Sequence, residues 1–545
     1  MMIISFLKKY KYTIAVFLFF QIIVYFQINP NTIWVRKYLF YFVNASSLLL
    51  ILHLISKCNK IITIILLIVF SLLITFEAYY GFFFNCTITL GIVTSIMVTN
   101  LAEVMDVMKD RILPCILIFG FSFFGIFKSA NELKRGNIPV KWSLLLLSFY
   151  IGFCYPFYVY KEIRKDENFA GLYKWKPVLT NQRVISERFP LIYGQISAVV
   201  AFLHEKSQER KFMLQDRIMP EGMFWKNSEE LPEKIFFVLG ESQYRKHLSL
   251  YGYEVRTTPF LDSLYQASSK MTIYDAVSPC CTTFEAVPLL LSFATPNNRN
   301  PLFEHKNIIE LANDAGYETV WLSNQITLDS WGSNTSFFTS LSHDVYFTGY
   351  DGRTGIIDDF KMIPKLQERY KRDRKQFFLI HLQGSHIGYA NKSDEIDKAV
   401  IQGDSRINQY DRSIHHTDRV LREIYKIMKN DSSAILYYIS DHGENPNMGG
   451  HVFWNGGFSQ FDVPMFFINQ TNIDIDSIVS RYFMYEKNRI NTLSSTNILA
   501  ELMGYSFSDE MIKKIKEESY YILHVNGQPF EWDVEWIMNN NEREK

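Results

Sequence analysis

Five apolar runs in the first 160 residues constrain the fold of this chain more than any other feature. They cover residues 12–28, 38–55, 61–84, 112–127 and 142–158. A helix needs about 17–25 apolar residues to cross a bilayer, and four of the runs reach the lower limit. The run 112–127 is one residue short and must recruit flanking residues. Five such runs in series, separated by short polar loops, predict an N-terminal α-helical bundle of five transmembrane helices.

The distribution of Lys and Arg predicts how this bundle is oriented. The first run lacks a small-residue cleavage site and is followed by four more runs, so it is expected to be an anchor and not a signal peptide. With a cytoplasmic N-terminus, nine Lys and Arg residues fall on the cytoplasmic side and four on the other. Everything after residue 158 then lies outside. In a bacterium with two membranes, this means a multi-pass inner-membrane protein with a periplasmic domain.

Two acidic residues of the N-terminal half need a reason. Glu77 lies near the outer end of the third run, and we expect it to reach the membrane interface rather than to serve a function. Glu103 lies in the following outer loop, within "SIMVTNLAEVMD". Because it is in a loop, its charge alone indicates nothing.

Charge and cysteine content exclude several classes of protein. The 56 Lys and Arg residues balance 56 Asp and Glu residues, which argues against nucleic acid as the main partner. An apolar content of 48% argues against disorder over most of the chain. The one close cysteine pair expected outside, Cys280–Cys281, is adjacent in sequence and would make a strained disulfide at best. The outer domain must therefore be held together by its core.

The rest of the chain predicts a bridge and a soluble α/β domain. Residues 161–230 show helical periodicity and are expected to be a bridging segment after the transmembrane domain 1–160. From residue 231 to 545, short apolar runs alternate with helical stretches. The runs are "KIFFVLGES", "YETVWLSNQ", "QFFLIHLQGSH" and "SAILYYISDHGE". Continuous apolar strands that alternate with helices predict a largely parallel sheet covered on both faces.

The ends of these predicted strands carry side chains that can bind metals. Ligands of open α/β sheets bind beyond the carboxyl ends of the strands. The polar residues there, or shortly after, are Glu241, His381, His386, Asp441, His442, Glu444 and His451. Carboxylate and imidazole together suit zinc or a similar first-row metal. A polar cluster such as "SDHGE" directly after an apolar strand is destabilising unless it binds something, which favours a metal site.

A hydroxyl pair in "AVSPCCTTFEAVPLLLSFAT" can supply a nucleophile. Thr282 and Thr283 precede an apolar helical run, and a helix N-terminus favours anions. A threonine there that touches a metal could ionise, attack phosphorus and hold the phosphoryl ester. The alternative is that Thr282 is only an N-cap, and both roles are compatible if Thr283 reacts. Pro288 is expected to kink this helix or to make it start later.

These residues together resemble bacterial phosphoethanolamine transferases of the alkaline phosphatase and sulfatase superfamily. The resemblance covers nearly the whole chain: the five apolar runs, "TNLAE", "GESQYRKHLSLYGYEVRTTPFLDSL", "TTFEAVPLLLSFAT", "HLQGSH" and "SDHGE". It implies an alkaline-phosphatase-like domain with Thr283 as nucleophile. It also implies one zinc ion bound by Glu241, Thr283, Asp441 and His442.

The resemblance further implies the substrates and the residues that bind them. Phosphatidylethanolamine would give its headgroup to Thr283, and lipopolysaccharide would then accept it. His386 and His451 match residues that bind the transferred phosphoryl group or a second zinc ion. Asn100 and Glu103 match a membrane-side loop implicated in substrate binding.

The acceptor and the rival functions stay open at this point. Lipid A-modifying members have cysteines where this chain has Pro279 and Leu289, which favours a core heptose over lipid A as the acceptor. A hydrolytic sulfatase would need a Cys/Ser-x-Pro/Ala-x-Arg element, which does not follow Cys280 or Cys281. A lipoteichoic-acid-type glycerol-phosphate transferase, another phosphodiesterase of the same fold and a non-catalytic membrane scaffold remain as alternatives. Oligomeric state cannot be inferred.

Overall fold

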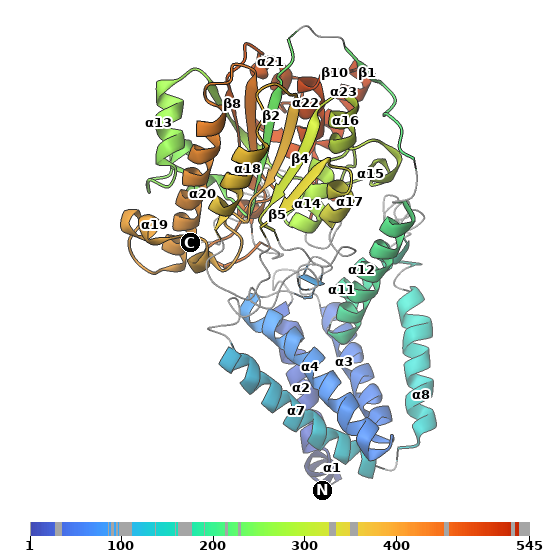
Figure 1. Cartoon of the computed structure of the whole chain (residues 1–545). Helices are drawn as coiled ribbons and strands as arrows, with labels where there is room; N and C mark the ends of the chain where they lie inside the picture. The colour runs from blue at the N-terminus through green and yellow to red at the C-terminus, as the bar shows by residue number, and fades with distance from the viewer. Residues whose placement is uncertain are drawn as a thin grey trace. The chain divides into compact units, whose positions relative to one another are not determined.

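The chain folds into two compact units (Figure 1). The first comprises Met1–Val93 and Met108–Ser207, and the second comprises Thr94–Val107 and Gln208–Lys545. The computed structural model describes residues 2–27, 35–84, 87–88, 92–93, 96, 112–136, 138–157, 160–161, 177–189, 191–212, 216–226, 230–325, 334–348, 358–451, 457–524 and 529–532.

All five predicted apolar runs are helical over their described residues. The helices of the first unit are α1 (Met2–Lys9), α2 (Lys11–Gln27), α3 (Val35–Ser56), α4 (Lys60–Phe84), α7 (Ile112–Arg135), α8 (Val140–Phe149) with the π-helical turn η2 (Tyr150–Cys154), α11 (Pro177–Arg188) and α12 (Ile192–Phe212). In the described part of the chain, three helices are long and apolar enough to cross a membrane: Lys60–Phe84, Ile112–Arg135 and Val140–Phe157. Lys11–Gln27 and Tyr41–Ser56 are apolar but shorter. As expected, the short fourth run recruits flanking residues, since α7 continues to Arg135.

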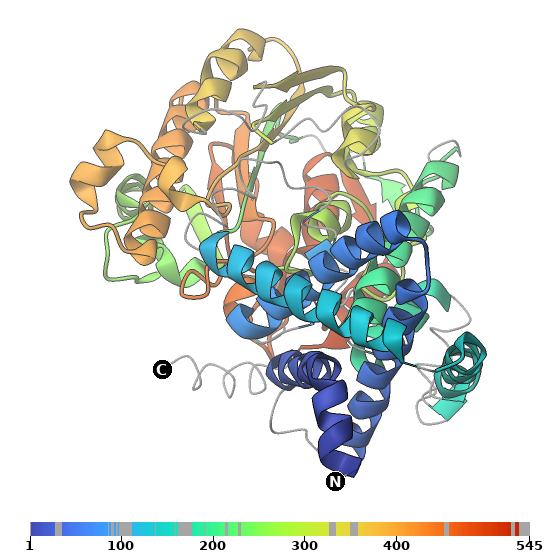
Figure 2. The same ribbon diagram turned by 90° about the horizontal axis from the view of Figure 1, so that it is seen from below.

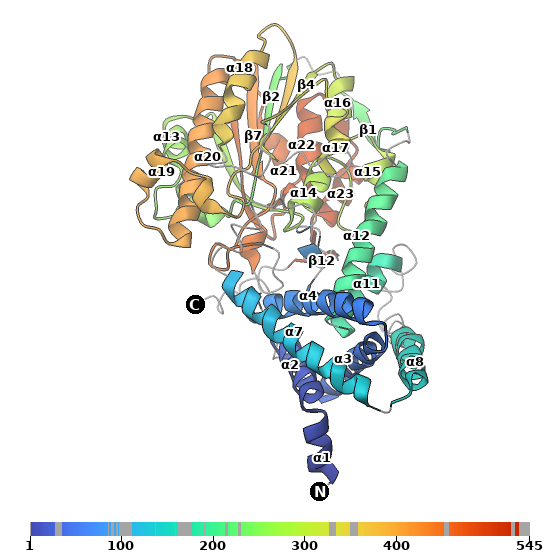
Figure 3. The same ribbon diagram turned by 60° about the horizontal axis from the view of Figure 1, so that its bottom comes forward.

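The helices of this unit pack through an apolar core with a few polar links. Helix α7 lies against α2 and α4 (Figures 2 and 3). Near the C-terminal end of α7, Glu132 accepts hydrogen bonds from the Thr13 backbone N–H and hydroxyl, both at 2.9 Å, close to the start of α2. Helix α3 is linked to α8 and η2 by His53 Nδ1 to Ser143 Oγ at 2.7 Å and by the Tyr150 hydroxyl, which donates to Asn44 Oδ1 at 2.8 Å. Such interhelical hydrogen bonds contribute to association where water is absent.

Glu77 does not reach an interface, and that expectation was wrong. Its side chain on α4 is 1% exposed, and its Oε2 accepts a hydrogen bond from Gln27 Nε2 of α2 at 2.6 Å. The same amide nitrogen donates to the Glu77 backbone carbonyl at 3.2 Å. Gly81, one helical turn further along α4, lets Gln27 approach, because a Cβ there would lie 3.2 Å from Gln27 Cγ. Packing between the two helices therefore provides a partner that the sequence pattern did not reveal.

An eight-stranded mixed sheet forms the centre of the second unit, with strand order β5-β4-β6-β2-β7-β8-β3-β9. Its strands are β2 (Lys234–Gly240), β3 (Met271–Val277), β4 (Glu318–Ser323), β5 (Asp344–Phe347), β6 (Gln376–His381), β7 (Ala434–Ser440), β8 (Asp462–Asn469) and β9 (Ile490–Asn491). Only β8 pairs antiparallel with its two neighbours, and every other pair is parallel. The prediction of a largely parallel sheet is therefore confirmed.

Two further sheets of two strands each lie in the described part of the chain. They pair β1 (Met223–Trp225) with β10 (Tyr505–Phe507) and β11 (Tyr521–Leu523) with β12 (Pro529–Glu531), both antiparallel. The helices of the unit are α13 (Pro259–Ala267), α14 (Thr283–Leu290), α15 (Pro301–Glu304), α16 (Ile308–Asp314), α17 (Asn334–Thr339), α18 (Ile363–Arg369), α19 (Glu395–Val400), α20 (Arg406–Met428), α21 (Ile475–Ser480), α22 (Ser495–Leu502) and α23 (Asp509–Glu518).

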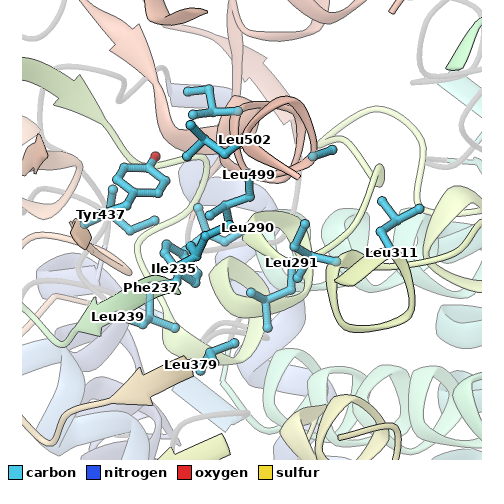
Figure 4. Close-up of a cluster of buried hydrophobic side chains, with 14 of the residues drawn as sticks. Ile235, Phe237, Leu239, Leu290, Leu291, Leu311, Leu379, Tyr437, Leu499 and Leu502 are labelled. Atoms are coloured by element: carbon cyan, nitrogen blue, oxygen red, sulfur yellow. The ribbon is translucent and has the colours of Figure 1, made fainter. Parts of the chain in front are cut away.

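Helices cover both faces of the large sheet (Figures 1 and 3). Alternate residues of β2 enter opposite cores: Phe237 packs in the cluster that includes α14, α16 and α22, and Phe236 packs in the cluster that includes α13, α18 and α20. Figure 4 shows the first cluster, where Leu290 and Leu499 meet Ile235 and Phe237 of β2. Because both faces are buried, the central strands read as continuous apolar runs. This three-layer core fixes the strand ends that carry the candidate site.

Replacing Gln27 with leucine is expected to destabilise the first unit. Gln27→Leu leaves the buried Glu77 carboxyl without its partner, and an orphaned buried polar group costs about 1–3 kcal/mol. The double variant Gln27→Leu/Glu77→Leu removes both polar groups and should recover most of the loss. Thermal unfolding of the purified chain in detergent, followed by helical circular dichroism, measures both. A double variant no more stable than the single one would contradict the pairing.

Candidate metal and nucleophile site

Two neighbouring strands place three candidate ligands at one edge of the sheet. Strands β2 and β7 run parallel, with Gly240 level with Ser440. Glu241 follows β2 directly, and Asp441 and His442 follow β7. The Asp441 backbone N–H donates to the Gly240 carbonyl at 3.0 Å, which extends the pairing as far as the site. The three side chains therefore project from adjacent positions of a rigid element.

The side chains of these residues converge with the Thr283 hydroxyl. His442 Nε2 lies 3.3 Å from Glu241 Oε1 and 3.4 Å from Asp441 Oδ2. Thr283 Oγ1 lies 3.1 Å from each Glu241 carboxylate oxygen and 3.2 Å from His442 Nε2. The ligand atoms of Glu241, Asp441 and His442 all lie within 4.8 Å of one another, close enough to share one ion. The four residues predicted as metal ligands are thus brought together.

Hydrogen bonds outside this cluster fix how each ligand points. Asp441 Oδ1 accepts from the backbone N–H groups of His442 at 2.7 Å and Ser242 at 3.1 Å. Ser242 has a φ of 57°, in the left-handed region that is uncommon outside glycine. His442 Nδ1 lies 2.8 Å from the Gly443 carbonyl oxygen, so Nδ1 carries a proton and Nε2 faces the carboxylates.

The cluster fits a divalent cation. Glu241, Asp441 and His442 are all fully buried, and Asp441 Oδ2 has no hydrogen-bond partner among the described residues. Two buried carboxylates are costly without a compensating cation. Burial lowers the pKa of His442, but the charge of Asp441 and the hydrogen bond with Glu241 outweigh it and raise that pKa to about 10. Burial and the charge of Glu241 raise the pKa of Asp441 to about 6. Positive charge is therefore strongly favoured here.

Two glycines of the sequence motifs allow the close packing behind these ligands. Gly384 of "HLQGSH" has a φ of 48°, and a Cβ there would lie 2.9 Å from the Glu241 backbone oxygen. Gly443 of "SDHGE" would place a Cβ 2.0 Å from the Ser459 backbone oxygen. Side chains cannot be accommodated at either position without moving backbone. The glycines are thus part of the site's architecture.

Thr283 is the first residue of α14, and Pro288 lies inside this helix. The helix therefore does not begin later, and the other expectation, a kink at Pro288, stays a prediction. Thr282 occupies the N-cap position, but its side chain makes no capping hydrogen bond. Its hydroxyl instead lies 3.6 Å from Cys280 Sγ. Thr283 is therefore the hydroxyl turned toward the carboxylates.

The remaining predicted site residues do not belong to the group of four that converges on Thr283. The His451 ring centroid lies 4.0 Å from that of His442 and 6.3 Å from that of His386, so the two candidate phosphoryl-binding histidines border the cluster. His381 ends β6, is buried against Trp321, and burial lowers its pKa to about 4, which keeps it neutral. Asn100 and Glu103 lie outside the described residues.

Gln325 joins the site and was not predicted. Its amide nitrogen donates to the Leu382 carbonyl at 2.6 Å and lies 3.4 Å from Glu241 Oε2. It therefore helps orient a candidate ligand. The signal was its place just after the predicted strand "YETVWLS", where β4 ends beside β6.

A second acidic cluster shows why the first one suits a metal. Asp394, Asp397 and His416 also lie within 4.8 Å of one another. The Asp397 carboxylate, however, already pairs with His415 at 2.6 Å, His416 at 2.8 Å and Arg419 at 2.9 Å. The charge of Asp397 is compensated by the chain's own cations. This second cluster is an ion-pair network, whereas Asp441 retains an oxygen without a partner among the described residues.

The chain is similar to known proteins. The family model described as Sulfatase matches residues 233–505. The chain is 28% identical over 242 residues to phosphoethanolamine transferase EptC of Escherichia coli, covering 41% of this chain and 42% of that protein. It is 23% identical over 416 residues to phosphoethanolamine transferase EptA of Helicobacter pylori, covering 73% of each. The chain thus spans less than half the length of the first relative.

A solved structure resembles nearly the whole chain. The integral membrane protein lipooligosaccharide phosphoethanolamine transferase A from Neisseria meningitidis matches with a TM-score of 0.62 at 16% identity, covering 91% of this chain and 94% of that one. At this identity the likeness concerns the fold. Since the family model spans half of the chain, including the β2 and β7 edges, the chain belongs to the sulfatase family.

Proposed function

We propose that this chain is a membrane-anchored, metal-dependent phosphoethanolamine transferase with Thr283 as its nucleophile. The observation that carries the proposal is the Thr283 hydroxyl, held 3.1–3.2 Å from Glu241 and His442 at a buried anionic cluster. A hydroxyl so placed can lose its proton and attack an electrophile. The names of EptC and of the two EptA proteins support phosphoethanolamine as the group transferred.

The proposed reaction has two displacements. Thr283 Oγ attacks the phosphorus of phosphatidylethanolamine, the bond to the glycerol oxygen breaks, and diacylglycerol leaves with a proton. The phosphoethanolamine group is then esterified to Thr283. A hydroxyl of the acceptor attacks the same phosphorus, the bond to Thr283 Oγ breaks, and the threonine is regenerated. Covalent catalysis of this kind splits one difficult displacement into two easier ones.

The ligand set supports zinc as the cofactor. Glu241, Asp441 and His442, with the Thr283 oxygen, offer the four nitrogen and oxygen donors that suit a tetrahedral ion. When bound, the metal lowers the pKa of the hydroxyl and stabilises charge on the phosphoryl oxygens. The chain's own residues hold the donor atoms in place: the Gly443 carbonyl fixes the His442 ring, and two backbone N–H groups fix Asp441.

We extend the proposal to the outer residues of the site. His386 and His451, which border the ligand cluster, would bind the transferred phosphoryl group or a second zinc ion. Asn100 and Glu103, outside the described residues, would contribute to substrate binding. The transmembrane domain would be 1–160, the bridge 161–230 and the catalytic domain 231–545.

The substrates and the location follow from chemistry and from charge. Lipopolysaccharide as acceptor agrees with the lipooligosaccharide named for the Neisseria structure. The Pro279 and Leu289 positions favour core heptose over lipid A. Phosphatidylethanolamine as donor suits a protein whose apolar helices keep it in a bilayer. The Lys and Arg bias supports an inner-membrane location with the catalytic domain in the periplasm.

Replacing Thr283 with alanine is expected to abolish transfer, because the attacking oxygen is removed. Mass spectrometry of lipopolysaccharide from cells that carry each variant measures the phosphoethanolamine increment and its position. Thr282→Ala is the matched control, since its hydroxyl makes no capping hydrogen bond, and it should retain most of the increment. Normal transfer by Thr283→Ala would exclude this nucleophile.

Replacing Asp441 with asparagine is expected to weaken metal binding in the purified protein. Losing an outer partner of a metal ligand alone costs about 10–100-fold in affinity, so losing a charged ligand should cost at least that much. Elemental analysis after dialysis against a zinc chelator measures retention. Asp394→Asn, in the second acidic cluster, should leave the zinc content unchanged. Equal zinc loss in both variants, or no zinc in the wild type, would contradict the proposed ligand set.

A further inference from the structure

Glu444 is a buried carboxylate beside the site that the proposed reaction does not use. It lies two residues after His442 in "SDHGE", and its side chain is fully buried. A carboxylate in such a place must be compensated, since an unpaired buried charge is strongly unfavourable. Its hydrogen-bond partners therefore indicate what it does.

Each oxygen of the Glu444 carboxylate has its own partner. Oε1 accepts a hydrogen bond from the Asn445 backbone N–H at 2.9 Å. Oε2 lies 3.3 Å from Nδ1 of His451. An ionised carboxylate only accepts hydrogen bonds, so with Glu444 ionised the Nδ1 atom that faces it carries the proton. The backbone contact fixes one oxygen, which leaves the other directed at the ring.

The His451 ring that Glu444 contacts lies next to the candidate metal ligand His442. The ring packs against His442, with centroids 4.0 Å apart, and faces His386 at 6.3 Å. Nδ1 and Nε2 are separated by one ring carbon, so a proton fixed on Nδ1 leaves Nε2 of the neutral ring with a lone pair. Carboxylates that orient histidines in this way are frequent around metal sites.

We infer that Glu444 is a positioning residue, which holds the Nδ1–H form of His451 so that Nε2 accepts a hydrogen bond from the incoming acceptor hydroxyl. This rests on the proposed function and concerns its second displacement. The hydrogen bond orients the hydroxyl oxygen toward the phosphorus of the Thr283 ester. Orientation of this kind is a major part of bringing two reactants together. In this role His451 receives the acceptor hydroxyl and leaves the transferred phosphoryl group to His386 and the metal site, so the first displacement, by Thr283 itself, does not need it.

Glu444→Gln is the decisive variant, because it keeps the size and shape of the side chain but replaces one hydrogen-bond-accepting oxygen with an NH₂ donor. The Asn445 N–H holds the amide oxygen, so the amide NH₂ faces His451 Nδ1. The ring must then accept at Nδ1 and carry its proton on Nε2, the reverse of the wild-type form. Nε2 can no longer accept from the acceptor hydroxyl. Overall transfer should fall about 10–100-fold, as for other outer partners of a metal site.

The test separates the two displacements in the full-length protein in detergent. With phosphatidylethanolamine alone, Glu444→Gln should form the phosphoethanolamine ester of Thr283 at the wild-type rate. On addition of lipopolysaccharide, the ester should persist in the variant and disappear in the wild type. Mass spectrometry of the Thr283 peptide measures both. Glu444→Asp keeps a carboxylate, so its ester should disappear faster than that of Glu444→Gln.

A matched control separates positioning from general stability. Asp411 also pairs with a histidine, His247 Nδ1 at 2.7 Å, and accepts a hydrogen bond from Tyr253. Asp411→Asn disrupts a similar buried pair and should not cause the Thr283 ester to accumulate. His451→Gln should make the Thr283 ester accumulate. Adding Glu444→Gln to that variant should not slow the loss of the ester any further, since the two residues act as a unit.

The outcomes distinguish this inference from the proposed function. A wild-type protein that never forms a Thr283 ester would refute the proposed function. If the wild type forms the ester and both Glu444 variants discharge it at the wild-type rate, Glu444 has no positioning role. Slow ester formation by Glu444→Gln with phosphatidylethanolamine alone would contradict the inference, because the effect would then not be specific to the second displacement. Ester accumulation in Asp411→Asn would contradict it as well, because the effect would then not be specific to Glu444.

Discussion

The burial of two carboxylates at the carboxyl ends of neighbouring strands is the constraint on which this site depends. Glu241 and Asp441 are fully buried at the carboxyl edge of β2 and β7, and their negative charges must be compensated there. The neighbouring His442 is held with its Nε2 toward them, and the Thr283 hydroxyl completes the cluster. Four donor atoms from three chain segments thus converge where a cation lowers the free energy of the folded state. The same cation would make the threonine reactive, so stability and chemistry share one requirement.

Three buried carboxylates of this chain are compensated in three ways, and the difference indicates function. Glu77 receives an amide hydrogen bond from Gln27 between apolar helices. Asp397 is surrounded by His415, His416 and Arg419. Asp441 keeps an oxygen that has no hydrogen-bond partner among the described residues. The amide of Gln27 completes the first site, and the cations Arg419 and His416 compensate the second. At the third, one imidazole, His442, lies beside two carboxylates, Glu241 and Asp441, so a further positive charge is favoured, which is the physical argument for a metal.

Much of the sheet could be predicted, because the apolar pattern of a strand buried on both faces is continuous. The four predicted strands are β4, β6, β2 and β7, which are consecutive in the sheet. Strand β8 was missed: it carries Pro464, which a sequence pattern reads as a break, and it runs antiparallel. The candidate metal ligands could be located from the strand ends, while Gln325 could not, because its place beside Glu241 arises only from the pairing of β4 with β6. The burial of Glu77 depends on the approach of α2, which no pattern within α4 encodes.

In Asp441, His442 and His451, one polar atom of the side chain contacts a fixed partner within the chain, and the other polar atom is left for the candidate site. Asp441 Oδ1 binds two backbone N–H groups, so Oδ2 faces the cluster. His442 Nδ1 binds the Gly443 carbonyl, so Nε2 faces Thr283. The contact of His451 Nδ1 with Glu444 repeats this arrangement one step further from the metal ligands. Fixing one atom of a side chain determines both its orientation and, for histidine, its tautomer. The orientation of these side chains is therefore set largely by backbone groups and by buried partners. A short motif such as "SDHGE" supplies several of these side chains within a few residues.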